Sequence, residues 1–240
     1  MQALIAVSPE AFAGQFWKHP GHYQYAVTTS FVPLSAAELR KAAAHLPLAF
    51  VQIAGEWQLV AILSLLENTN LLVGPQGQWL GGYVPAALRA YPFRLVRDEQ
   101  QQGLVLATEA TGAHLVPASE GQPFFEQNGL PSAELQRVMN FLIELENGRV
   151  QITRAANALA AAGVLTPWEL VASHNGQDQK VAGLFHVNDA ALAALKPDQL
   201  VRLQAEGGLP VAYAQLFSEE QFSRLQQAIQ TQEALRSAQG

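Results

Sequence analysis

The residues best suited to recognise another molecule gather in one short stretch, GQWLGGYVPAALRAYPFRLV, at positions 77–96. Tyrosine, tryptophan and arginine combine apolar area with hydrogen-bond donors, and these residue types carry most of the binding energy in protein interfaces. Arg89 has the planar donor fork that binds a carboxylate through two parallel hydrogen bonds. We therefore predict a binding surface in this stretch and in a nearby loop, made of Trp79, Tyr83, Arg89, Tyr91, Phe93, Arg94, Phe124 and Phe125.

The same stretch has a structural interpretation, in which its residues hold a tight crossover of the chain. Gly77 then makes a turn, while Trp79 and Phe93 fill the core of a sheet. Pro85 opens a short helix, and Pro92 ends it, because the residue before a proline is pushed out of the helical region. The two interpretations are compatible if the large aromatic side chains lie inside and the arginines and tyrosines lie at a rim.

Catalytic chemistry has weaker support in the sequence. His19 and His22 flank a Pro-Gly turn, and no motif supplies a third metal ligand. The remaining histidines of the predicted hairpins have no nucleophile elbow near them, so no serine-based triad is recognisable. Glu109, Glu120 and Glu126 are close in sequence and stay open as an acid–base set. We therefore expect no metal and no cofactor, and we assign no catalytic residue.

Composition limits the partners and the compartment. The formal net charge of −6 comes without any basic run, whereas a nucleic-acid partner requires a basic patch. Cysteine is absent, which excludes disulfides and thiolate chemistry. The longest apolar run, residues 59–66, is far shorter than the ~20 residues that span a bilayer. The first residues do not resemble a signal peptide. We expect a soluble, cytoplasmic protein without membrane insertion or nucleic acid.

The elements in the first half of the chain predict an antiparallel sheet built from hairpins. Ser35 and Glu38 have the spacing of a capping box and predict a short helix that runs to about residue 45. The runs LAFVQI and WQLVAILSL predict a hairpin that turns at Ala54, Gly55 and Glu56. NTNLLVGPQGQWL predicts strand, turn and strand, and FRLVRDEQQQGLVLATEA predicts another pair of strands joined by a polar loop.

The second half of the chain is richer in helix. Ser132 caps the predicted helix AELQRVMNFLIELE, which has one apolar stripe, and Asn147-Gly148 is expected to break or kink it. The helix QITRAANALAAAG then resumes and ends at Gly163.

A second hairpin is predicted across residues 168–187, with its turn at Asn175-Gly176. Short helices are expected to start near Asn188 and Pro197, and a last helix at Ser218. We thus predict an α+β fold with a mixed lobe at residues 1–128 and a mainly helical lobe at residues 129–240, which together make one domain if they share a core.

The chain resembles the SapC-like family of bacterial proteins over nearly all of its length after about residue 25. The resemblance rests on FVPLSAAELRKAAAHLPLAF, NLLVGPQGQWLGGYVPAALRAYPFRLV, GQPFFEQNG and GLFHVNDAALAALKPDQLVRLQAEGGLPVAYAQLFS. Its most specific residues are Asn70, Gly77-x-Trp79, Tyr83-x-Pro85 and Arg89-x-Tyr91-Pro92-Phe93. The chain departs from the family in carrying Thr108-Glu109 where the resemblance leads us to expect an acidic pair.

The family name suggests peptide transport or surface-layer export. What the resemblance implies is an accessory role in handling peptides or metabolites, beside TonB-dependent receptors, flavin-dependent halogenase-like proteins or cupin-like oxygenases. We therefore predict a non-enzymatic protein whose partner is a peptide, a protein such as a modifying enzyme or receptor, or a small metabolite. Two alternatives stay open: an enzyme, either a hydrolase or a subunit of a modifying oxygenase, and a structural subunit of an oligomer such as a homodimer.

Overall fold

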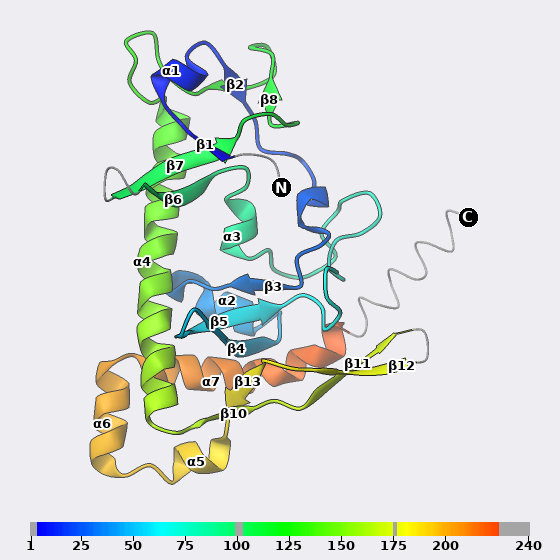
Figure 1. Cartoon of the computed structure of the whole chain (residues 1–240), viewed down its shortest axis with the longest axis vertical. Helices are drawn as coiled ribbons and strands as arrows, with labels where there is room; N and C mark the ends of the chain where they lie inside the picture. Colours follow the sequence, from blue (N-terminus) through cyan, green and yellow to red (C-terminus); the bar gives the residue numbers. More distant parts are fainter. Residues whose placement is uncertain (1–3, 99–102, 175–176, 226–240) are drawn as a thin grey trace. The chain divides into compact units, whose positions relative to one another are not determined.

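The structure is a computed structural model that describes residues 4–98, 103–174 and 177–225. It confirms the predicted α+β class, because helices are combined with sheets whose described strand pairs are all antiparallel (Figure 1). The chain forms two compact units, each built from two stretches: unit 1 from Met1–Gly21 and Arg89–Glu146, and unit 2 from His22–Leu88 and Asn147–Gly240. The division into lobes at residue 128 stays a prediction.

Unit 1 contains two small antiparallel sheets and the first half of the longest helix. One sheet has the order β1-β7-β6 and the other has the order β8-β2-β9. The elements are β1 (Leu4–Ala6), α1 (Pro9–Phe12), β2 (Phe16–Trp17), β6 (Arg94–Asp98), β7 (Gly103–Glu109), β8 (Leu115–Val116), β9 (Gln122–Pro123) and the start of α4 (Ala133–Ala161). The strand pair β6–β7 was predicted, and its polar connector lies outside the described residues.

Aromatic rings fill the core of unit 1. Phe12 stacks on Phe124 with 4.5 Å between ring centroids, and Phe93 meets Trp17 edge to face at 4.7 Å. Such offset and edge-to-face pairs add to the stabilisation from buried area. The apolar stripe of α4 covers these rings with Leu135, Val138 and Leu142. The Ser132 hydroxyl caps this helix as predicted, since it accepts a hydrogen bond from the Leu135 N–H at 3.2 Å.

Unit 2 is built on a five-stranded sheet of order β10-β13-β4-β5-β3, with a separate two-stranded ribbon β11-β12. The strands are β3 (Phe31–Pro33), β4 (Leu48–Ile53), β5 (Glu56–Ile62), β10 (Leu165–Pro167), β11 (Leu170–His174), β12 (Gln177–Val181) and β13 (Phe185–Val187). The helices are α2 (Leu39–Ala43), α3 (Ala86–Arg89), the second half of α4, α5 (Asp189–Ala193), α6 (Pro197–Ala205) and α7 (Gly208–Ser218), with 3-10 turns η1 (Gln24–Ala26), η2 (Ala36–Glu38) and η3 (Glu219–Gln221).

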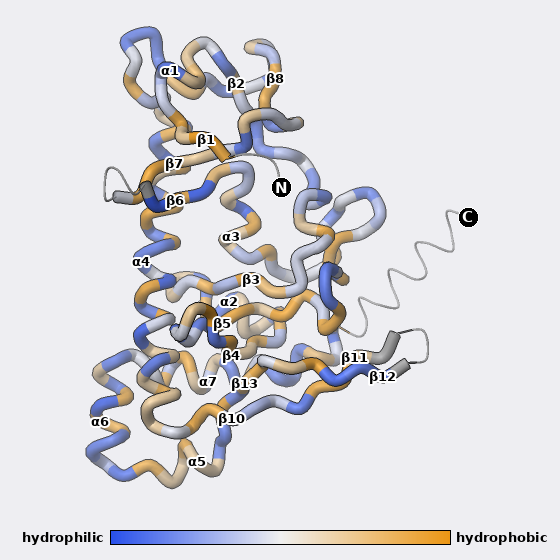
Figure 2. Tube along the Cα trace, viewed as in Figure 1, coloured by the Kyte–Doolittle hydropathy of each residue, from blue (hydrophilic) through white to orange (hydrophobic). Residues whose placement is uncertain are grey.

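The β4–β5 hairpin confirms the strongest of the strand predictions. Its six paired positions run from Leu48 opposite Ala61 to Ile53 opposite Glu56. The turn residues Ala54 and Gly55 both have positive φ, as a tight hairpin turn requires. Figure 2 shows that hydrophobic residues follow much of β4 and β5, and the inner part of both strands is fully buried. The ribbon β11–β12 confirms the second predicted hairpin, although its turn falls outside the described residues.

The predicted break at Asn147-Gly148 is wrong, because α4 runs without interruption from Ala133 to Ala161. Gly148 has another purpose. A Cβ there would overlap Ser35 Oγ and would lie 3.0 Å from the backbone nitrogen of Ala36. The glycine is therefore needed for the close approach of the 35–38 turn to the helix. Gly163, with a φ of +72°, follows the helix end as predicted.

The predicted strand pair in NTNLLVGPQGQWL is also wrong. The structure has a turn there with a single bridge between Val73 and Trp79. Two backbone hydrogen bonds of 2.8 Å join the arms of this turn, from the Gly74 N–H to the Gln78 carbonyl and from the Leu80 N–H to the Leu72 carbonyl, and Gln78 Oε1 accepts from the Gln76 N–H at 3.0 Å. The pairing is therefore limited to a short bridge and does not extend into two regular strands.

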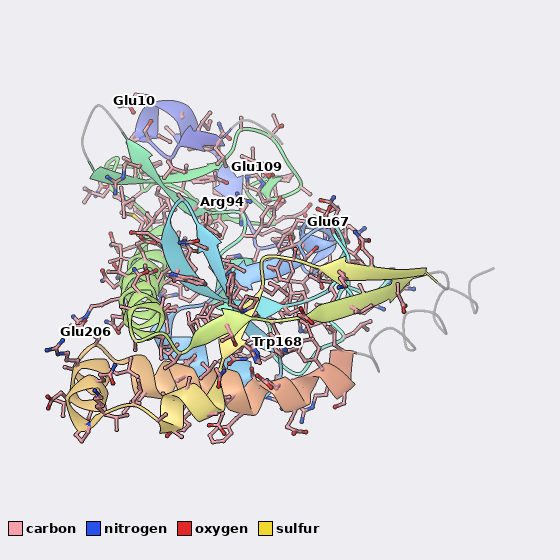
Figure 3. All side chains as sticks on the ribbon, turned by 60° about the horizontal axis from the view of Figure 1, so that its bottom comes forward. Glu10, Glu67, Arg94, Glu109, Trp168 and Glu206 are labelled. Carbon is pink, nitrogen blue, oxygen red and sulfur yellow. The ribbon has the colours of Figure 1, made fainter. Side chains whose placement is uncertain are left out.

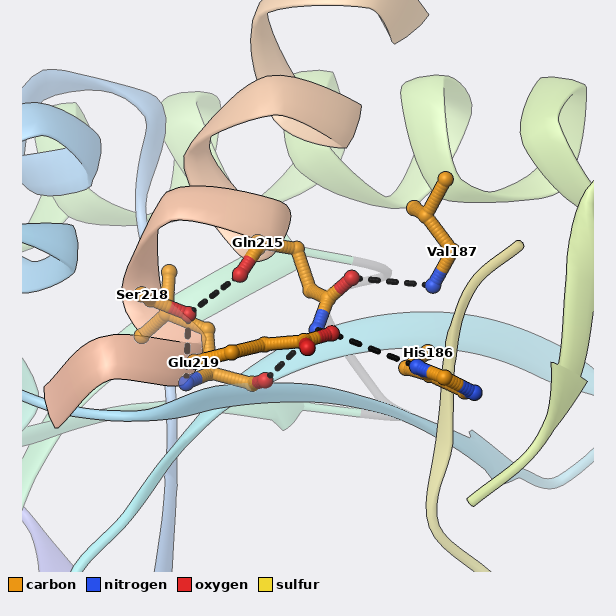
Figure 4. Close-up of polar contacts among 6 residues, drawn as sticks. His186, Val187, Gln215, Ser218 and Glu219 are labelled. Carbon is orange, nitrogen blue, oxygen red and sulfur yellow. Dashed lines mark hydrogen bonds and ion pairs between the residues drawn. The ribbon is translucent and has the colours of Figure 1, made fainter. Parts of the chain in front are cut away.

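The last predicted helix does not begin at Ser218, since α7 ends there. Ser218 is an internal residue whose hydroxyl donates to the Gln215 carbonyl at 2.6 Å and accepts from the Leu48 N–H at 3.0 Å. Figure 4 shows the network that this builds: the fully buried Gln215 amide accepts from the Val187 N–H and donates to Glu219, which also contacts His186 at 3.2 Å. The network ties α7 to β4 and β13.

Among the described residues, no helix is both long and apolar enough to cross a membrane, and this includes α4.

Candidate functional site

The predicted binding residues fall into both units. Trp79 and Tyr83 belong to unit 2, whereas Arg89, Tyr91, Phe93, Arg94, Phe124 and Phe125 belong to unit 1. Phe93 and Phe124 are 1% and 0% exposed and form part of the aromatic core described above, and the half-buried Phe125 packs against that core. The residues of this set that reach the surface of unit 1 are therefore the two arginines and, in part, Tyr91 and Phe125.

The register of the β6–β7 pair brings Tyr91 and Glu109 together. Arg94, the first residue of β6, lies opposite Ala107 of β7. Glu109 is two positions further along β7, so it extends past the start of β6 and faces the Tyr91-Pro92 segment, whose peptide bond is cis. The Tyr91 hydroxyl donates a hydrogen bond of 2.9 Å to Glu109 Oε2.

Burial and this contact both favour the protonated form of Tyr91. Burial raises the pKa of Tyr91 to about 12, the hydrogen bond to Glu109 and its negative charge add to the rise, and Arg94 opposes it. A phenol with this pKa is protonated throughout the neutral range, so Tyr91 is a hydrogen-bond donor and not a base. The arrangement supports recognition better than proton transfer.

Two exposed arginines flank the Tyr91–Glu109 pair. The Arg89 guanidinium carbon lies 5.4 Å from the centre of the Phe141 ring on α4, within the range of a cation–π contact. Arg94 is exposed at the start of β6 and belongs to the same unit as Glu109; both residues are labelled in Figure 3. Arginine is the side chain best suited to bind carboxylates at an interface, because it stays charged and presents several donors in a fixed geometry.

A buried pair behind Glu109 fixes the end of β7. Thr108 Oγ1 donates to the Pro92 carbonyl at 3.2 Å and lies 3.2 Å from His114 Nε2. Which of these two groups donates depends on the tautomer of His114. No hydrogen-bond partner of Nδ1 is found in the described part of the chain, although the Glu109 backbone is close.

The same pair shows why His114 is structural. Burial lowers the pKa of His114, Glu109 acts in the opposite direction, and the residue is only 1% exposed. A Cβ at Gly112 would lie 2.9 Å from His114 Nδ1, so this position must be small. The Thr108–His114 pair was not predicted from the sequence. The one signal available there is that the two residues lie on either side of the loop that follows the β7 strand.

In unit 2, Trp79 and Tyr83 are used in internal hydrogen bonds. The Trp79 indole N–H donates to the Tyr83 carbonyl at 3.0 Å, and the Tyr83 hydroxyl donates to Glu38 Oε2 at 2.9 Å. Glu38 also accepts from the backbone N–H groups of Ala86 at 2.7 Å and Ser35 at 3.1 Å, which is the carboxylate half of the predicted capping box. Glu38 is 4% exposed and is a structural anchor.

Gly77 and Gly81 are required because neighbouring side chains approach their Cα atoms too closely to leave room for a Cβ. Gly77 has a φ of +78°, and a Cβ there would lie 2.9 Å from His22 Cβ. A Cβ at Gly81 would lie 2.8 Å from the Trp79 indole nitrogen. The predicted turn at Gly77 is therefore observed, with a packing reason that the sequence alone does not contain.

The histidines and carboxylates considered as catalytic groups are dispersed. His19 contacts the Tyr91 carbonyl at 3.1 Å in unit 1, while His22 belongs to unit 2. Glu120 pairs with Lys18 at 2.8 Å at the surface. Within residues 4–98, 103–174 and 177–225, no three histidine, aspartate or glutamate side chains converge in a group that could hold a metal ion.

The fold and the site together define an α+β protein with open antiparallel sheets and an arginine- and tyrosine-bearing surface in unit 1. A family model described as SapC matches residues 7–225 of the 240-residue chain. The chain belongs to the SapC family. No curated protein matches it. No solved structure matches it either.

Proposed function

We propose that this protein is a non-enzymatic accessory protein that binds an acidic peptide segment, free or displayed on a protein partner, through Arg89, Tyr91 and Arg94. The observation that carries the proposal is a tyrosine whose hydroxyl is held by Glu109, with the exposed Arg89 two residues before it and the exposed Arg94 three residues after it in the chain. A surface whose aromatic side chain is already ordered loses less conformational entropy on binding.

The chemistry of the surface selects the class of partner. Arg94 and Arg89 provide two positive charges at this surface, whereas the formal net charge of the whole chain is −6. Arginine forks favour carboxylates, because the guanidinium stays charged and presents several donors in a fixed planar geometry. We therefore expect acidic side chains or a carboxyl terminus in the bound segment.

Binding of acidic peptides on an array tests the proposal. The purified protein is applied to peptides in which each glutamate or aspartate is paired with its amide counterpart. We expect preference for the acidic form, and we expect the double variant Arg89→Gln/Arg94→Gln to lose about fivefold or more in affinity, since exposed charge pairs contribute up to about 1 kcal/mol each. Arg137→Gln is the matched control, because Arg137 is an exposed arginine on α4 that already pairs with Glu134.

Equal binding of acidic and amide peptides, or a double variant that binds like the parent, would show that this surface is not the recognition site. The wider roles expected from the family resemblance, handling of peptides or metabolites beside receptors or modifying enzymes and a cytoplasmic location, are part of the same proposal. Binding roles for Trp79, Tyr83 and Phe125 stay predictions from the sequence, and these three residues are not part of the surface proposed in unit 1.

A further inference from the structure

Unit 2 contains an open groove of about 780 Å³ between the second half of α4, helix α6 and the start of β5. Figure 1 shows α6 beside the end of α4, and both elements belong to unit 2. The volume lies in the range of ligand sites in proteins. The groove does not include any of the residues assigned above to peptide recognition in unit 1.

Part of the groove wall is apolar and consists mainly of small side chains. Ala158, Ala161 and Ala162 face it from α4, with Leu203 from α6. Val150, also in the wall, is 54% exposed, so its apolar side chain lacks cover from the described residues. Thr153 adds no accessible donor, because its hydroxyl oxygen is buried. An apolar ligand body would be desolvated against these walls.

Most polar groups of the groove are already engaged. Arg154 pairs with Glu206 and donates to the Ala205 carbonyl at 3.0 Å, which closes one end; Figure 3 labels Glu206 there. Asn157 Oδ1 accepts from the Trp57 N–H at 3.1 Å. The Gln199 side chain accepts from the Lys196 N–H at 3.0 Å.

Two side chains of opposite charge in the groove lining are not engaged in the contacts described above. Glu56, the first residue of β5, and Arg202, on α6, are exposed and line the groove from different elements. Neither charged group has an ion-pair or hydrogen-bond partner among the residues that the structure describes. A ligand that complements this groove has one cationic end, one anionic end and an apolar body between them.

We propose that this groove binds a short apolar peptide with free termini, whose carboxylate pairs with Arg202 and whose ammonium group pairs with Glu56. A single amphipathic acid would leave Glu56 unpaired, and a single amine would leave Arg202 unpaired. The site is independent of the surface in unit 1, so either assignment can fail without the other.

Isothermal titration calorimetry with leucine- and alanine-containing peptides of two to four residues tests the site, using each peptide in free, N-acetylated and C-amidated form. We expect the free form to bind most tightly. Amidation should weaken binding to the parent about threefold, which corresponds to about 0.65 kcal/mol for an exposed charge pair. The same amidation should have little effect in Arg202→Gln. Acetylation of the peptide N-terminus should likewise weaken binding to the parent and should have little effect on binding to Glu56→Gln.

This pairing of ligand and protein changes is a double-mutant cycle, which isolates each contact from effects on folding. Ala161→Leu narrows the groove at an exposed position and should weaken all forms, while Arg40→Gln, an exposed arginine on α2 outside the groove, should change nothing. Absence of heat at millimolar peptide would overturn the proposal. So would equal binding of free and doubly blocked peptides, or binding that neither Arg202→Gln nor Glu56→Gln alters.

Discussion

The two units contain the same side-chain contact in different settings. Tyr83 donates to Glu38 in unit 2, Tyr91 donates to Glu109 in unit 1, and both hydrogen bonds measure 2.9 Å. Glu38 is almost completely buried and also accepts from two backbone N–H groups, whereas Glu109 is half-buried at the end of a strand. The same pair therefore serves as an anchor of the fold in one unit and orders a surface in the other.

What surrounds the carboxylate decides its role. Around Glu38 the donors come from the chain itself, so the site is closed and complete. Around Tyr91 and Glu109 the neighbours are arginines whose guanidinium groups reach the surface. Buried hydrogen bonds to a charged group contribute more to stability than exposed ones, because solvent screens the exposed ones. The difference between the two pairs can be measured directly.

The largest expected effect is from removal of the buried carboxylate. Glu38→Ala leaves the N–H groups of Ser35 and Ala86 and the Tyr83 hydroxyl without their acceptor, and we expect the free energy of unfolding to fall by about 3–5 kcal/mol. Glu109→Ala should cost about 1 kcal/mol, since its site is partly solvated. Urea denaturation measures both. Similar losses for the two variants would show that burial does not separate the pairs.

Next in size is the approach of α4 to the turn that carries the anchor. Gly148→Ala forces its new methyl group against Ser35 and Ala36, and overpacking of this kind costs about 1–3 kcal/mol. Alanine gains about 1 kcal/mol in helix propensity over glycine, so the net loss should be up to about 2 kcal/mol.

Asn147→Ala is the control for this helix, because position 147 is exposed on the same turn and lacks the close contact. This change should leave the midpoint of denaturation unchanged or slightly raised. A stabilising Gly148→Ala would contradict the close approach of Ser35 to the helix.

Removing each tyrosine hydroxyl sharpens the comparison at the level of a single bond. Tyr83→Phe should lower the free energy of unfolding by about 1–2 kcal/mol, because a buried carboxylate loses a donor. Tyr91→Phe should cost about 0.5 kcal/mol, because water can replace the donor at a partly exposed site. On the peptide array, Tyr91→Phe should weaken binding and Tyr83→Phe should not. The reverse pattern would transfer the recognition site to unit 2.

The smallest expected effect is a pH dependence that belongs to Tyr91. Its pKa in the folded protein, about 12, lies above the ordinary value of 10.0, so the protonated form is favoured by folding. The resulting stability is present below pH 10 and is lost as the pH rises toward 12. Ultraviolet difference titration of the parent against Tyr91→Phe should place the phenolate of this residue near the top of that window. A phenolate that forms with an unshifted pKa would show that Tyr91 is not buried against Glu109.

The two tyrosine–glutamate pairs also show which features of a site can be predicted from sequence patterns and which cannot. Ser35 and Glu38 have capping-box spacing, but the spacing does not reveal that the carboxylate also accepts from Tyr83 and from the Ala86 backbone, over 40 positions away. In unit 1, Tyr91 was predicted as a binding residue, and only the register of β6 and β7 places Glu109 beside it. Side-chain type could be judged from the sequence, whereas the partner could not.

The sequence by itself determined the elements whose signals are local: the β4–β5 hairpin with its positive-φ turn, the Ser132 cap, the starts of α5 and α6, and the α+β class. These follow from hydrophobic period and from cap and turn chemistry within a few residues. Tertiary structure decided the uses of Gly148, Gln215 and Glu38 and formed the groove lined by Glu56 and Arg202. The reason is physical: each depends on groups distant in sequence, whose meeting is set by packing and strand register rather than by local preference.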